Sequence, residues 1–412
     1  MKPALHPIEL LLRLPRESEP VLLLSGEGIP DLSRWSWCFA GPYRHTTELT
    51  EALRWARAND ENPRAVGLIR YEQGVRWVAP DIRARPDPFG QPPSIYRVYD
   101  GGYRYDHVTG DGSVFGTAPE LQAALALSET PSLSGGLEAD LRPRWSKAHY
   151  ERRLSGLLAL IRDGEIYQGN LSFPLQGRYA GDPRAAFARL APRAPSFAAY
   201  VGSRTGPSIV SASPECLVRF AGPTRHATSY PIKGTRPRSA VEAEDRVLRE
   251  ALATSEKDGA EHVMIVDLVR NDLGRVAEAS TVRVDPFRSI ESYPGVHHMV
   301  SAVHGTIRSE VQPEALLRSL FPGGSITGAP KRRAVEILDD VEGDARGMYT
   351  GSILLLWGDG SMSASIAIRT AEIMEDELRF GVGGGIVLDS DADDEWAETQ
   401  AKARALSEAL RA

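Results

Sequence analysis

The chain has 412 residues and a formal net charge of −7, with 48 lysines and arginines against 55 aspartates and glutamates. A chain of this length exceeds one ordinary hydrophobic core, so we expect two domains, or one large α/β domain with a subdomain. A hydrophobic fraction of 42% with 25% charged residues excludes disordered and fibrous proteins, and the negative charge gives no electrostatic footprint for nucleic acid.

The cysteines and the apolar runs indicate the compartment. Cys38 and Cys216 are too few for a disulfide scaffold or a thiolate metal site, which fits a reducing cytoplasm. The apolar run at 8–14 is interrupted by Glu9 and Arg13 and is followed by no small-residue cleavage pattern. No stretch approaches the roughly 18 consecutive apolar residues of a membrane-spanning helix. We therefore expect a soluble, cytoplasmic protein that binds neither membranes nor nucleic acid.

The first 130 residues have the pattern of a β-rich subdomain with one helix. Residues 21–24 predict a buried strand that ends at Ser25-Gly26, and 47–58 carry apolar residues at helical spacing. The stretch 96–105 predicts a β-hairpin closed by Gly101-Gly102, because two glycines tolerate the positive φ angles of a tight turn. Residues 131–145, rich in proline, serine and glycine, are the predicted linker.

The remainder, 146–412, alternates between helix and strand patterns. Ser146 is placed to cap a helix that Gly164 ends, and its buried stripe would start with Tyr150 and Leu154. Further strands are predicted at 197–201, 208–212, 217–220, 225–232, 296–307, 352–357, 363–370 and 378–382. Further helices are predicted at 241–253, 256–274, after 331, and at 391–410.

Lys233 is the residue around which a reaction can be imagined. It lies between a strand stiffened by Pro231 and a turn at Gly234, and Ser213-Pro214-Glu215 precedes it by eighteen positions. A lysine amine held in a cavity can act as a nucleophile, and a buried glutamate can act as a general acid. An isolated lysine is more often a solvated surface charge, so the motif alone does not decide.

Two pairs of carboxylates point to a metal. Asp258 and Glu261 are one turn apart on the helix at 256–274, and Glu395 and Glu398 are three apart on the last helix. Mg²⁺ takes oxygen ligands from one or two carboxylates together with water and substrate oxygens, so two such helices could share one ion. The alternative, paired glutamates on a solvated helix face, is also open.

The glycine-rich stretch 322–331 precedes a predicted helix. It lacks the Lys-Ser/Thr ending of a nucleotide-binding P-loop, because Ala329 and Pro330 follow Gly328. Its helix N-terminus and hydroxyls, Ser325 among them, could still bind a carboxylate through backbone N–H groups. An ordinary capped turn explains the pattern equally well.

With these residues in view, the chain resembles the chorismate-utilising enzymes from about Ser146 to Leu410, and more weakly before residue 130. The resemblance implies an α+β fold of the anthranilate synthase component I type, with two facing, mainly antiparallel sheets flanked by helices. It also implies that residues 1–130 add strands to the same sandwich, while 146–412 form the chorismate-binding catalytic domain. It rests on ordered blocks at 213–215, 231–235, 261–274, 322–331, 366–370, 383–387 and 395–402.

Two positions choose among the branches of that family. Lys233 is typical of the aminodeoxychorismate synthases, whereas anthranilate synthases have alanine there. Gln168 occupies the place of the lysine base of isochorismate and salicylate synthases, and an amide cannot activate water near neutral pH. The resemblance therefore favours amination of chorismate over addition of water.

The family pattern also implies roles for individual residues. Glu261 and Glu398 would hold Mg²⁺, with Glu395 and Asp258 acting through water, and the ion would bind the ring carboxylate. Asp258 is expected not to bind the metal directly, because its side chain is shorter than the glutamate common at this position. Lys233 is the expected covalent nucleophile and Glu215 the general acid, protonated when substrate is bound. The substrate-binding residues implied by the resemblance are Arg369, Tyr349, Gly383, Gly384, Gly385, His298, Ser325 and Thr235.

The expected reaction is a transaminase-type conversion of chorismate and ammonia to 4-amino-4-deoxychorismate, on the route to para-aminobenzoate and folate. Ammonia would come from a separate glutamine amidotransferase subunit, because the chain carries no Gly-x-Cys-x-Gly nucleophile region. Tryptophan, which some relatives bind near a Leu-Leu-Glu-Ser stretch, is an open partner for the N-terminal region, where this chain has Leu23-Leu24-Ser25. The rival functions are anthranilate synthase component I and a noncatalytic chorismate-binding regulatory subunit.

Overall fold

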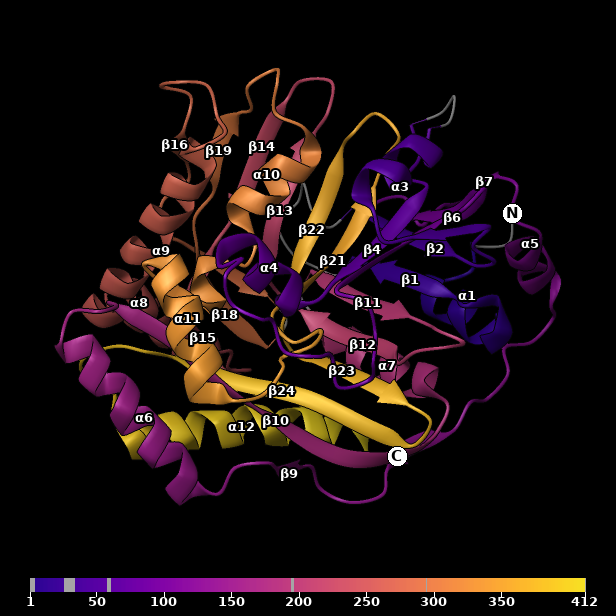
Figure 1. Cartoon of the computed structure of the whole chain (residues 1–412). Coiled ribbons are helices and arrows are strands. Elements are labelled where there is room, and N and C mark those ends of the chain that lie inside the picture. The colour runs from indigo at the N-terminus through magenta and orange to yellow at the C-terminus, as the bar shows by residue number, and fades with distance from the viewer. Residues whose placement is uncertain (1–3, 26–33, 58–60, 194–195, 294, 412) are drawn as a thin grey trace.

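The computed structural model describes residues 4–25, 34–57, 61–193, 196–293 and 295–411. In this part of the chain, antiparallel strands form two large sheets and one small sheet, and helices flank them (Figure 1). The expected α+β fold with two facing, mainly antiparallel sheets is confirmed.

The first large sheet has twelve strands within the described residues. Its order is β20 (Gly328–Ala329), β10 (Gln168–Gly181), β24 (Glu377–Ile386), β23 (Thr370–Met374), β12 (Ser208–Ser213), β11 (Phe197–Val201), β1 (Val21–Leu24), β2 (Trp35–Phe39), β6 (Gly101–Asp106) and β7 (Gly112–Gly116). Two short strands also pair with β10, namely β8 (Gly135–Leu137) and β9 (Arg142–Pro143).

The second large sheet has nine described strands, and a third sheet has three. The nine are β16 (Arg283–Val284), β19 (Val303–Thr306), β14 (His226–Tyr230), β13 (Cys216–Ala221), β22 (Met362–Ala367), β21 (Gly351–Leu356), β4 (Ala65–Ile69), β5 (Ser94–Val98) and β3 (Arg44–Thr46). The small sheet consists of β15 (Ile232–Pro237), β18 (Val296–Val300) and β17 (Ser289–Tyr293).

The helices cover the outer faces of the sheets and the small sheet. They are α1 (Pro7–Arg13), α3 (Leu49–Trp55), α4 (Tyr71–Val78), α5 (Pro119–Ala126), α6 (Lys147–Arg162), α7 (Pro183–Leu190), α8 (Glu242–Ala253), α9 (Glu256–Gly274), α10 (Pro313–Leu320), α11 (Lys331–Glu342) and α12 (Ala392–Leu410). The described residues also include three short 3₁₀ turns, each between a helix and a strand: η1 (Arg16–Ser18), η2 (Ala191–Arg193) and η3 (Gly324–Ile326).

The core is divided by the sheets. One cluster, which includes Val21, Phe39, Leu68 and Ile353, fills the space between the two large sheets. A second cluster lies between the first sheet and helices such as α6 and α12, and a third between the second sheet and helices such as α9 and α10. In Figure 1, α12 runs along β24 and β10. The layers are therefore helix, sheet, sheet and helix.

Helix α6 follows the prediction from sequence, because its cap and its buried face are both determined by local residues. Ser146 caps it by accepting a hydrogen bond from the His149 N–H at 3.3 Å, and Gly164 follows it with φ +80°. Its buried face contains Tyr150 and Leu154, as the spacing predicted. The strand at 21–24 is also confirmed.

Strands from before residue 130 join both large sheets. Strand β1 lies between β11 and β2, and β4 lies between β21 and β5. The segment predicted as a linker contains β8 and β9, which pair with β10. The boundaries at 130 and 145 stay a prediction.

The hairpin expected at 96–105 is wrong. Strands β5 and β6 lie in different sheets, so the chain crosses from one layer to the other near Asp100. Gly101 and Gly102 stand in strand β6, and a Cβ on Gly101 would lie 2.5 Å from the Phe115 carbonyl oxygen. Glycine is required there by close packing of backbone on backbone, and not by a turn.

Three further expected strands are each split where the chain passes from one sheet to another. One of them is 296–307, which divides into β18 and β19. Residues 363–370 divide into β22 and β23, and residues 225–232 divide at Pro231 into β14 and β15. Strands β12 and β13 cross between the large sheets beside β22 and β23, because β12 pairs with β23 and β13 pairs with β22. Glu215 and Arg369 both lie at these adjacent crossings.

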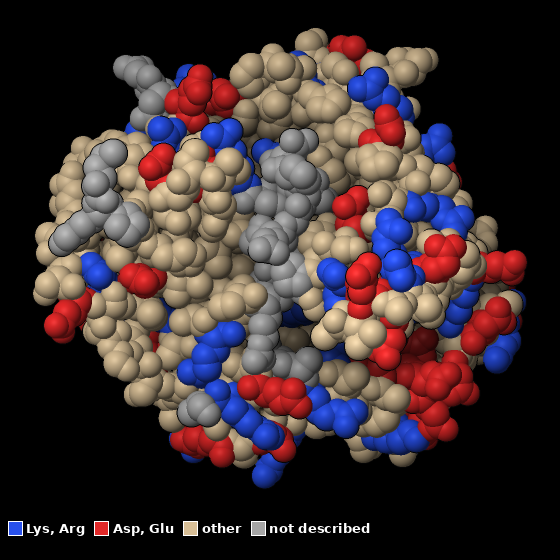
Figure 2. All heavy atoms as spheres, turned by 180° about the vertical axis from the view of Figure 1, so that it is seen from behind, with Lys and Arg blue, Asp and Glu red and all other residues tan. Residues whose placement is uncertain are grey.

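The surface carries no dominant charge on the face opposite Figure 1. Figure 2 shows lysine and arginine side chains interspersed with aspartate and glutamate over that face. No helix in the described part of the chain combines the length and apolar character that crossing a bilayer requires.

Candidate active site

Lys233 lies in a β-bulge. Ile232 pairs with Val300 and Thr235 pairs with His298, so Lys233 and Gly234 together stand opposite one residue of β18. Gly234 has φ +90°, a conformation that favours glycine. Because a bulge bends its strand and re-aims a side chain, the local sequence directs Lys233 toward α9.

The amine of Lys233 forms an ion pair with Glu261 of α9. The Nζ atom lies 2.8 Å from Glu261 Oε2, and the two side chains are 26% and 16% exposed. A Cβ placed on Gly385 would lie 3.3 Å from the same Nζ, so strand β24 approaches the amine closely. The nucleophile predicted from sequence is thus partly buried between β15, α9 and β24.

Glu215 is buried at the crossing from β12 to β13, with 6% of its surface exposed. The Ser213 hydroxyl accepts a hydrogen bond from the Glu215 N–H at 3.2 Å. The Ser325 hydroxyl donates a hydrogen bond to Glu215 Oε1 at 2.9 Å. Burial raises the pKa of the Glu215 carboxyl to about 7, while Ser325 and the charge of Lys233 oppose the rise. A carboxyl with this pKa can donate a proton near neutral pH.

His298 and Thr235 stand opposite each other on β18 and β15. Thr235 Oγ1 and His298 Nδ1 are 2.9 Å apart, and His298 is 2% exposed. Burial lowers the pKa of His298 to about 4, and the charge of Arg369 adds to this effect. The imidazole is therefore neutral at physiological pH, and its Nε2 is buried without a hydrogen-bond partner.

Arg369 adopts a left-handed backbone conformation, with φ 51°, where β22 gives way to β23. The Ala212 N–H donates to its carbonyl oxygen at 3.0 Å, which ties this crossing to that of β12. Within the described residues, no carboxylate lies in ion-pair distance of its guanidinium. A cation near His298 without an anionic partner is suited to bind an anionic ligand.

The three glycines continue strand β24, which extends to Ile386 and so past the predicted strand end at 382. Gly383, Gly384 and Gly385 pair with Ser172, Leu171 and Asn170 of β10. Strand β23 pairs with β24 only as far as Phe380. In the described structure, the other side of β24 at the glycines therefore has no partner strand.

Tyr349 is buried beside the same strand. A Cβ on Gly381 would lie 2.1 Å from Tyr349 Cγ, so the ring packs directly on the backbone of β24. Burial raises the pKa of its phenol to about 12, which keeps the hydroxyl protonated as a donor. Tyr349 thus packs on β24 at Gly381, in the strand that carries the three predicted glycines.

The four predicted metal ligands lie on α9 and α12, each with a nearby polar partner. Glu261 pairs with Lys233, and Asp258 Oδ2 lies 2.8 Å from Arg236 Nη2. Ser390 Oγ donates to Glu395 at 2.8 Å, and Lys402 Nζ lies 2.6 Å from Glu398. Across the described chain, no three His, Cys, Asp or Glu side chains are close enough to form a metal site as they stand.

The donor set nevertheless fits Mg²⁺ chemically. Burial raises the pKa of Glu395, and the charge of Glu398 adds to the rise. Burial also opposes ionisation of Glu398, but Lys402 and then Lys233 outweigh it and lower the pKa. Lys233 thus acts electrostatically on both glutamates of α12 and pairs with Glu261 of α9. The carboxylates of the two helices face one cation, and oxygen ligands of this kind suit a hard metal ion.

Comparison with known proteins assigns the chain to the family that its sequence resembles. Residues 38–408 match the family described as chorismate binding enzyme. The chain belongs to this family. Aminodeoxychorismate synthase component 1 of Klebsiella aerogenes is 38% identical over 341 residues, which cover 81% of this chain and 74% of the relative. Anthranilate synthase component 1 1 of Haloarcula marismortui is 40% identical over 273 residues, or 66% of this chain and 55% of the relative.

A solved structure extends the similarity to the fold. Anthranilate synthase component I from Streptococcus pneumoniae TIGR4 superposes with a TM-score of 0.80 at 27% identity, and the match covers 93% of each chain. The resemblance read from the ordered sequence blocks is therefore confirmed for the family.

In this chorismate binding enzyme, sequence reasoning gave Gln168 only a negative role. Its side chain is 1% exposed, and both Oε1 and Nε2 are buried without a partner. The amide lies beside the glycines, since a Cβ on Gly385 would be 3.0 Å from its Nε2. Buried polar atoms are normally satisfied, so this unpaired amide and His298 Nε2 are free to pair with a polar ligand.

Lys402 is a second residue that the sequence reading left without a role. It pairs with Glu398 and donates to the Gly383 carbonyl oxygen at 2.7 Å. The Glu398-to-Lys402 spacing of four on one helix was the available signal. Lys402 joins α12 to β24 next to the candidate metal ligands.

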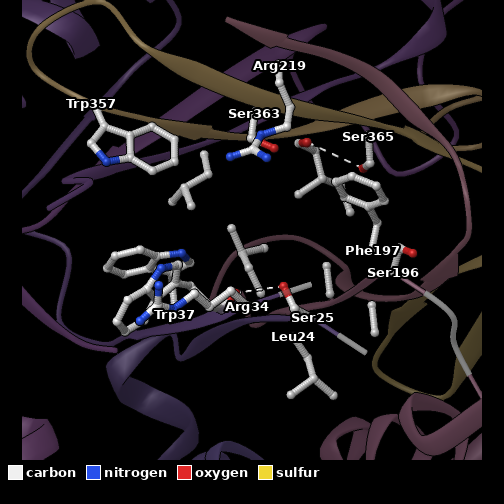
Figure 3. A pocket seen from close by; sticks show the side chains of 16 residues that line it. Leu24, Ser25, Arg34, Trp37, Ser196, Phe197, Arg219, Trp357, Ser363 and Ser365 are labelled. Atoms are coloured by element: carbon white, nitrogen blue, oxygen red, sulfur yellow. Dashed lines mark hydrogen bonds between the residues drawn. The ribbon is translucent and has the colours of Figure 1, made fainter. Parts of the chain in front are cut away.

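A separate cavity of about 120 Å³ lies between the two large sheets and contains none of the predicted site residues. Figure 3 shows Trp37 and Trp357 on one side of it, with Arg34 and Arg219 among the other residues that line it. The two indoles meet at a centroid distance of 6.3 Å. The described residues that line this cavity include no aspartate or glutamate.

Proposed function

We propose that this chain is component 1 of an aminodeoxychorismate synthase, which converts chorismate and ammonia to 4-amino-4-deoxychorismate. The observation that carries the proposal is Lys233, which a bulge places in a partly buried position, where its charge acts on the buried acid Glu215. The family assignment and the 38% identity to a relative of that name support the same reading. In the family resemblance, lysine at this position is typical of the aminodeoxychorismate synthases, whereas the anthranilate synthases have alanine there.

In the proposed reaction the Lys233 amine attacks ring carbon 2, and the two ring double bonds shift as the hydroxyl on carbon 4 leaves. Glu215, whose pKa burial raises to about 7, gives its proton to the departing hydroxyl, which leaves as water. Ammonia then adds at carbon 4 and the electrons return, which expels Lys233 from carbon 2. Atoms balance: one hydroxyl is exchanged for one amino group, and the enolpyruvyl group is retained.

The ion pair with Glu261 has to be broken before this attack. An ammonium has no lone pair for attack, and the Nζ atom of Lys233 lies 2.8 Å from Glu261 Oε2, directed at that carboxylate. The amine therefore becomes a nucleophile only when Glu261 binds another partner and the proton is lost. This requirement joins the lysine to the metal ligands in a single sequence of events.

Glu261 and Glu398 would hold Mg²⁺, with Glu395 beside them. Asp258 would act less directly, because its carboxylate already forms an ion pair with Arg236. When bound, the ion supplies positive charge that binds the ring carboxylate and offsets developing negative charge. This chain's own residues would bind the rest of the substrate. Arg369 and Tyr349 face the enolpyruvyl carboxylate in this proposal, with backbone donors of Gly383, Gly384 and Gly385 beside them.

His298 and the hydroxyls complete the proposed substrate site. Neutral His298 offers Nε2 to the substrate while Thr235 holds its Nδ1. Ser325 acts through Glu215, to which it donates. The buried amide of Gln168 would pair with polar substrate atoms beside Lys233.

A partner subunit is part of the proposal, since the similar relatives are named component 1. We propose that this partner is a glutamine amidotransferase that supplies ammonia. A cytoplasmic location is supported by the two cysteines, Cys38 and Cys216, which are both buried and unpaired.

Binding of tryptophan by the N-terminal region stays a prediction. The cavity of Figure 3 is lined by Leu23, Leu24 and Ser25, the stretch from which tryptophan was expected. Its described lining lacks a carboxylate to pair with the ammonium group of an amino acid. Calorimetric titration with tryptophan tests the prediction, and absence of heat at millimolar ligand would reject it.

The reaction is tested by incubating the protein with chorismate, Mg²⁺ and an ammonium salt. A nonaromatic amino acid without free pyruvate supports the proposal. A fluorescent aromatic product with pyruvate identifies the rival anthranilate synthase, a name that other relatives carry. Binding of chorismate without any conversion would indicate the noncatalytic regulatory subunit.

A further inference from the structure

Arg346 is buried at the start of the segment that leads into Tyr349 and is 5% exposed. Its guanidinium forms a two-point ion pair with Glu342, with Nε to Oε2 at 2.8 Å and Nη2 to Oε1 at 2.7 Å. It also donates to the carbonyl oxygens of Asn170 and Ile326, each at 2.7 Å, and to the Thr350 hydroxyl at 3.3 Å. One side chain thus joins three segments that are far apart in the sequence.

Each of these segments carries part of the candidate site. Asn170 follows Gln168 on β10, Ile326 follows Ser325 in η3, and Thr350 follows Tyr349. Ser325 in turn holds the carboxyl of Glu215. A displacement of Arg346 would therefore reach the acid, the buried amide and the tyrosine together.

Glu342 strengthens the same arrangement from the end of α11. Its Oε1 accepts hydrogen bonds from both the N–H and the hydroxyl of Ser172, each at 2.8 Å. Ser172 pairs with Gly383 in the ladder between β10 and β24. The Tyr71 ring covers the other side of the guanidinium, at 4.3 Å from Cζ to the ring centroid.

We infer that Arg346, held by Glu342, is a positioning residue that fixes β10, η3 and the Tyr349 segment relative to one another so that the proposed amination can occur. The inference rests on the proposed function. A planar guanidinium is suited to this work because its donors point in separate fixed directions, whereas a lysine ammonium is a point charge on a flexible stem.

Two variants separate positioning from stability. Arg346→Lys keeps a charge for Glu342 but cannot reproduce the fork, so the protein should fold while kcat falls roughly tenfold or more. Arg346→Met combined with Glu342→Gln leaves no unpaired buried charge, and kcat should fall roughly 10²-fold, with KM for chorismate changed less than about threefold. If the double variant does not fold, kcat of Arg346→Lys alone tests the positioning role.

The matched control is Arg97→Met with Glu19→Gln. Arg97 is similarly buried, lies 3.7 Å from Glu19 and also donates to a backbone carbonyl, that of Gly202, but it contacts no segment of the site. This pair should lower the thermal midpoint without lowering kcat. If the Arg346 variants keep the kcat of this control, the inference is overturned.

The pH dependence of kcat distinguishes a positioning role from a structural one, because a loss of stability alone would not shift it. When η3 shifts, Glu215 loses the hydrogen bond from Ser325 that favours its ionised form, so the alkaline limb of kcat should move to higher pH. An unmoved limb with unchanged kcat contradicts the inference. If the wild type makes an aromatic product, the proposed function fails, and kcat for that reaction still measures the role of Arg346.

Discussion

Replacing Glu215 by glutamine tests whether this carboxyl is neutral near neutral pH. Burial raises its pKa from an ordinary 4.5 to about 7, and glutamine keeps an acceptor for the Ser325 hydroxyl without carrying charge. Because the folded-state pKa lies above the unfolded value, the contribution of the protonated acid to stability is fully present below about pH 4.5. It is lost as the pH rises through about 7.

The difference between 4.5 and about 7, at about 1.36 kcal/mol per pH unit, amounts to roughly 3 kcal/mol. Glu215→Gln should therefore raise the free energy of unfolding by up to roughly 3 kcal/mol at pH 8.5, and by less than about 1 kcal/mol at pH 5. Urea-induced unfolding at the two pH values measures this. Glu72, whose pKa burial also raises to about 7, gives the matched variant Glu72→Gln, which should show the same dependence. An equal effect of Glu215→Gln at both pH values would refute the reasoning.

Three other outcomes are expected. Lys233→Ala should lower kcat for aminodeoxychorismate by roughly 10³-fold or more, because the nucleophile is lost, and unchanged turnover would remove covalent catalysis from the proposal. Gly385→Ala would place a Cβ 3.0 Å from Gln168 Nε2 and 3.3 Å from Lys233 Nζ, and kcat should fall roughly tenfold. The control is Gly156→Ala, at a helical position where no atom lies within 4 Å of the new Cβ, and it should leave kcat unaltered. Glu398→Gln should weaken Mn²⁺ binding by roughly tenfold or more in a titration followed by electron paramagnetic resonance, and unchanged affinity would exclude it as a ligand.

The fold was predictable where the signal is local. The cap at Ser146 and the apolar stripe of α6 are determined within one helix, and both were correct. The crossings between sheets were missed because alternation continues through them: residues 363–370 have the pattern of one strand although the partners change at Arg369. Gly101-Gly102 was wrongly assigned to a turn, and the predicted strand at 378–382 ended before the triple glycine. The reason is related, since both stretches depend on distant backbone that packs against them or pairs with them.

The candidate site divides in the same way. Its residue types were identified from motifs and from the family resemblance, but their partners were not. The contact between Lys233 and Glu261 depends on how β15 meets α9, and the unpaired amide of Gln168 is evident only once its surroundings are known. No sequence pattern pointed to Arg346, because its positioning role depends on hydrogen bonds to acceptors in three separate segments.

Interleaving of the N-terminal strands limits how the chain can be divided. A fragment of residues 146–412 would lack β1 and β4, and so would leave β11 and β21 as bare edge strands at the centre of each former sheet. Rows of unpaired N–H and C=O groups on long apolar edges recruit strands from other molecules. Such a fragment should therefore aggregate even though it retains every residue of the candidate site.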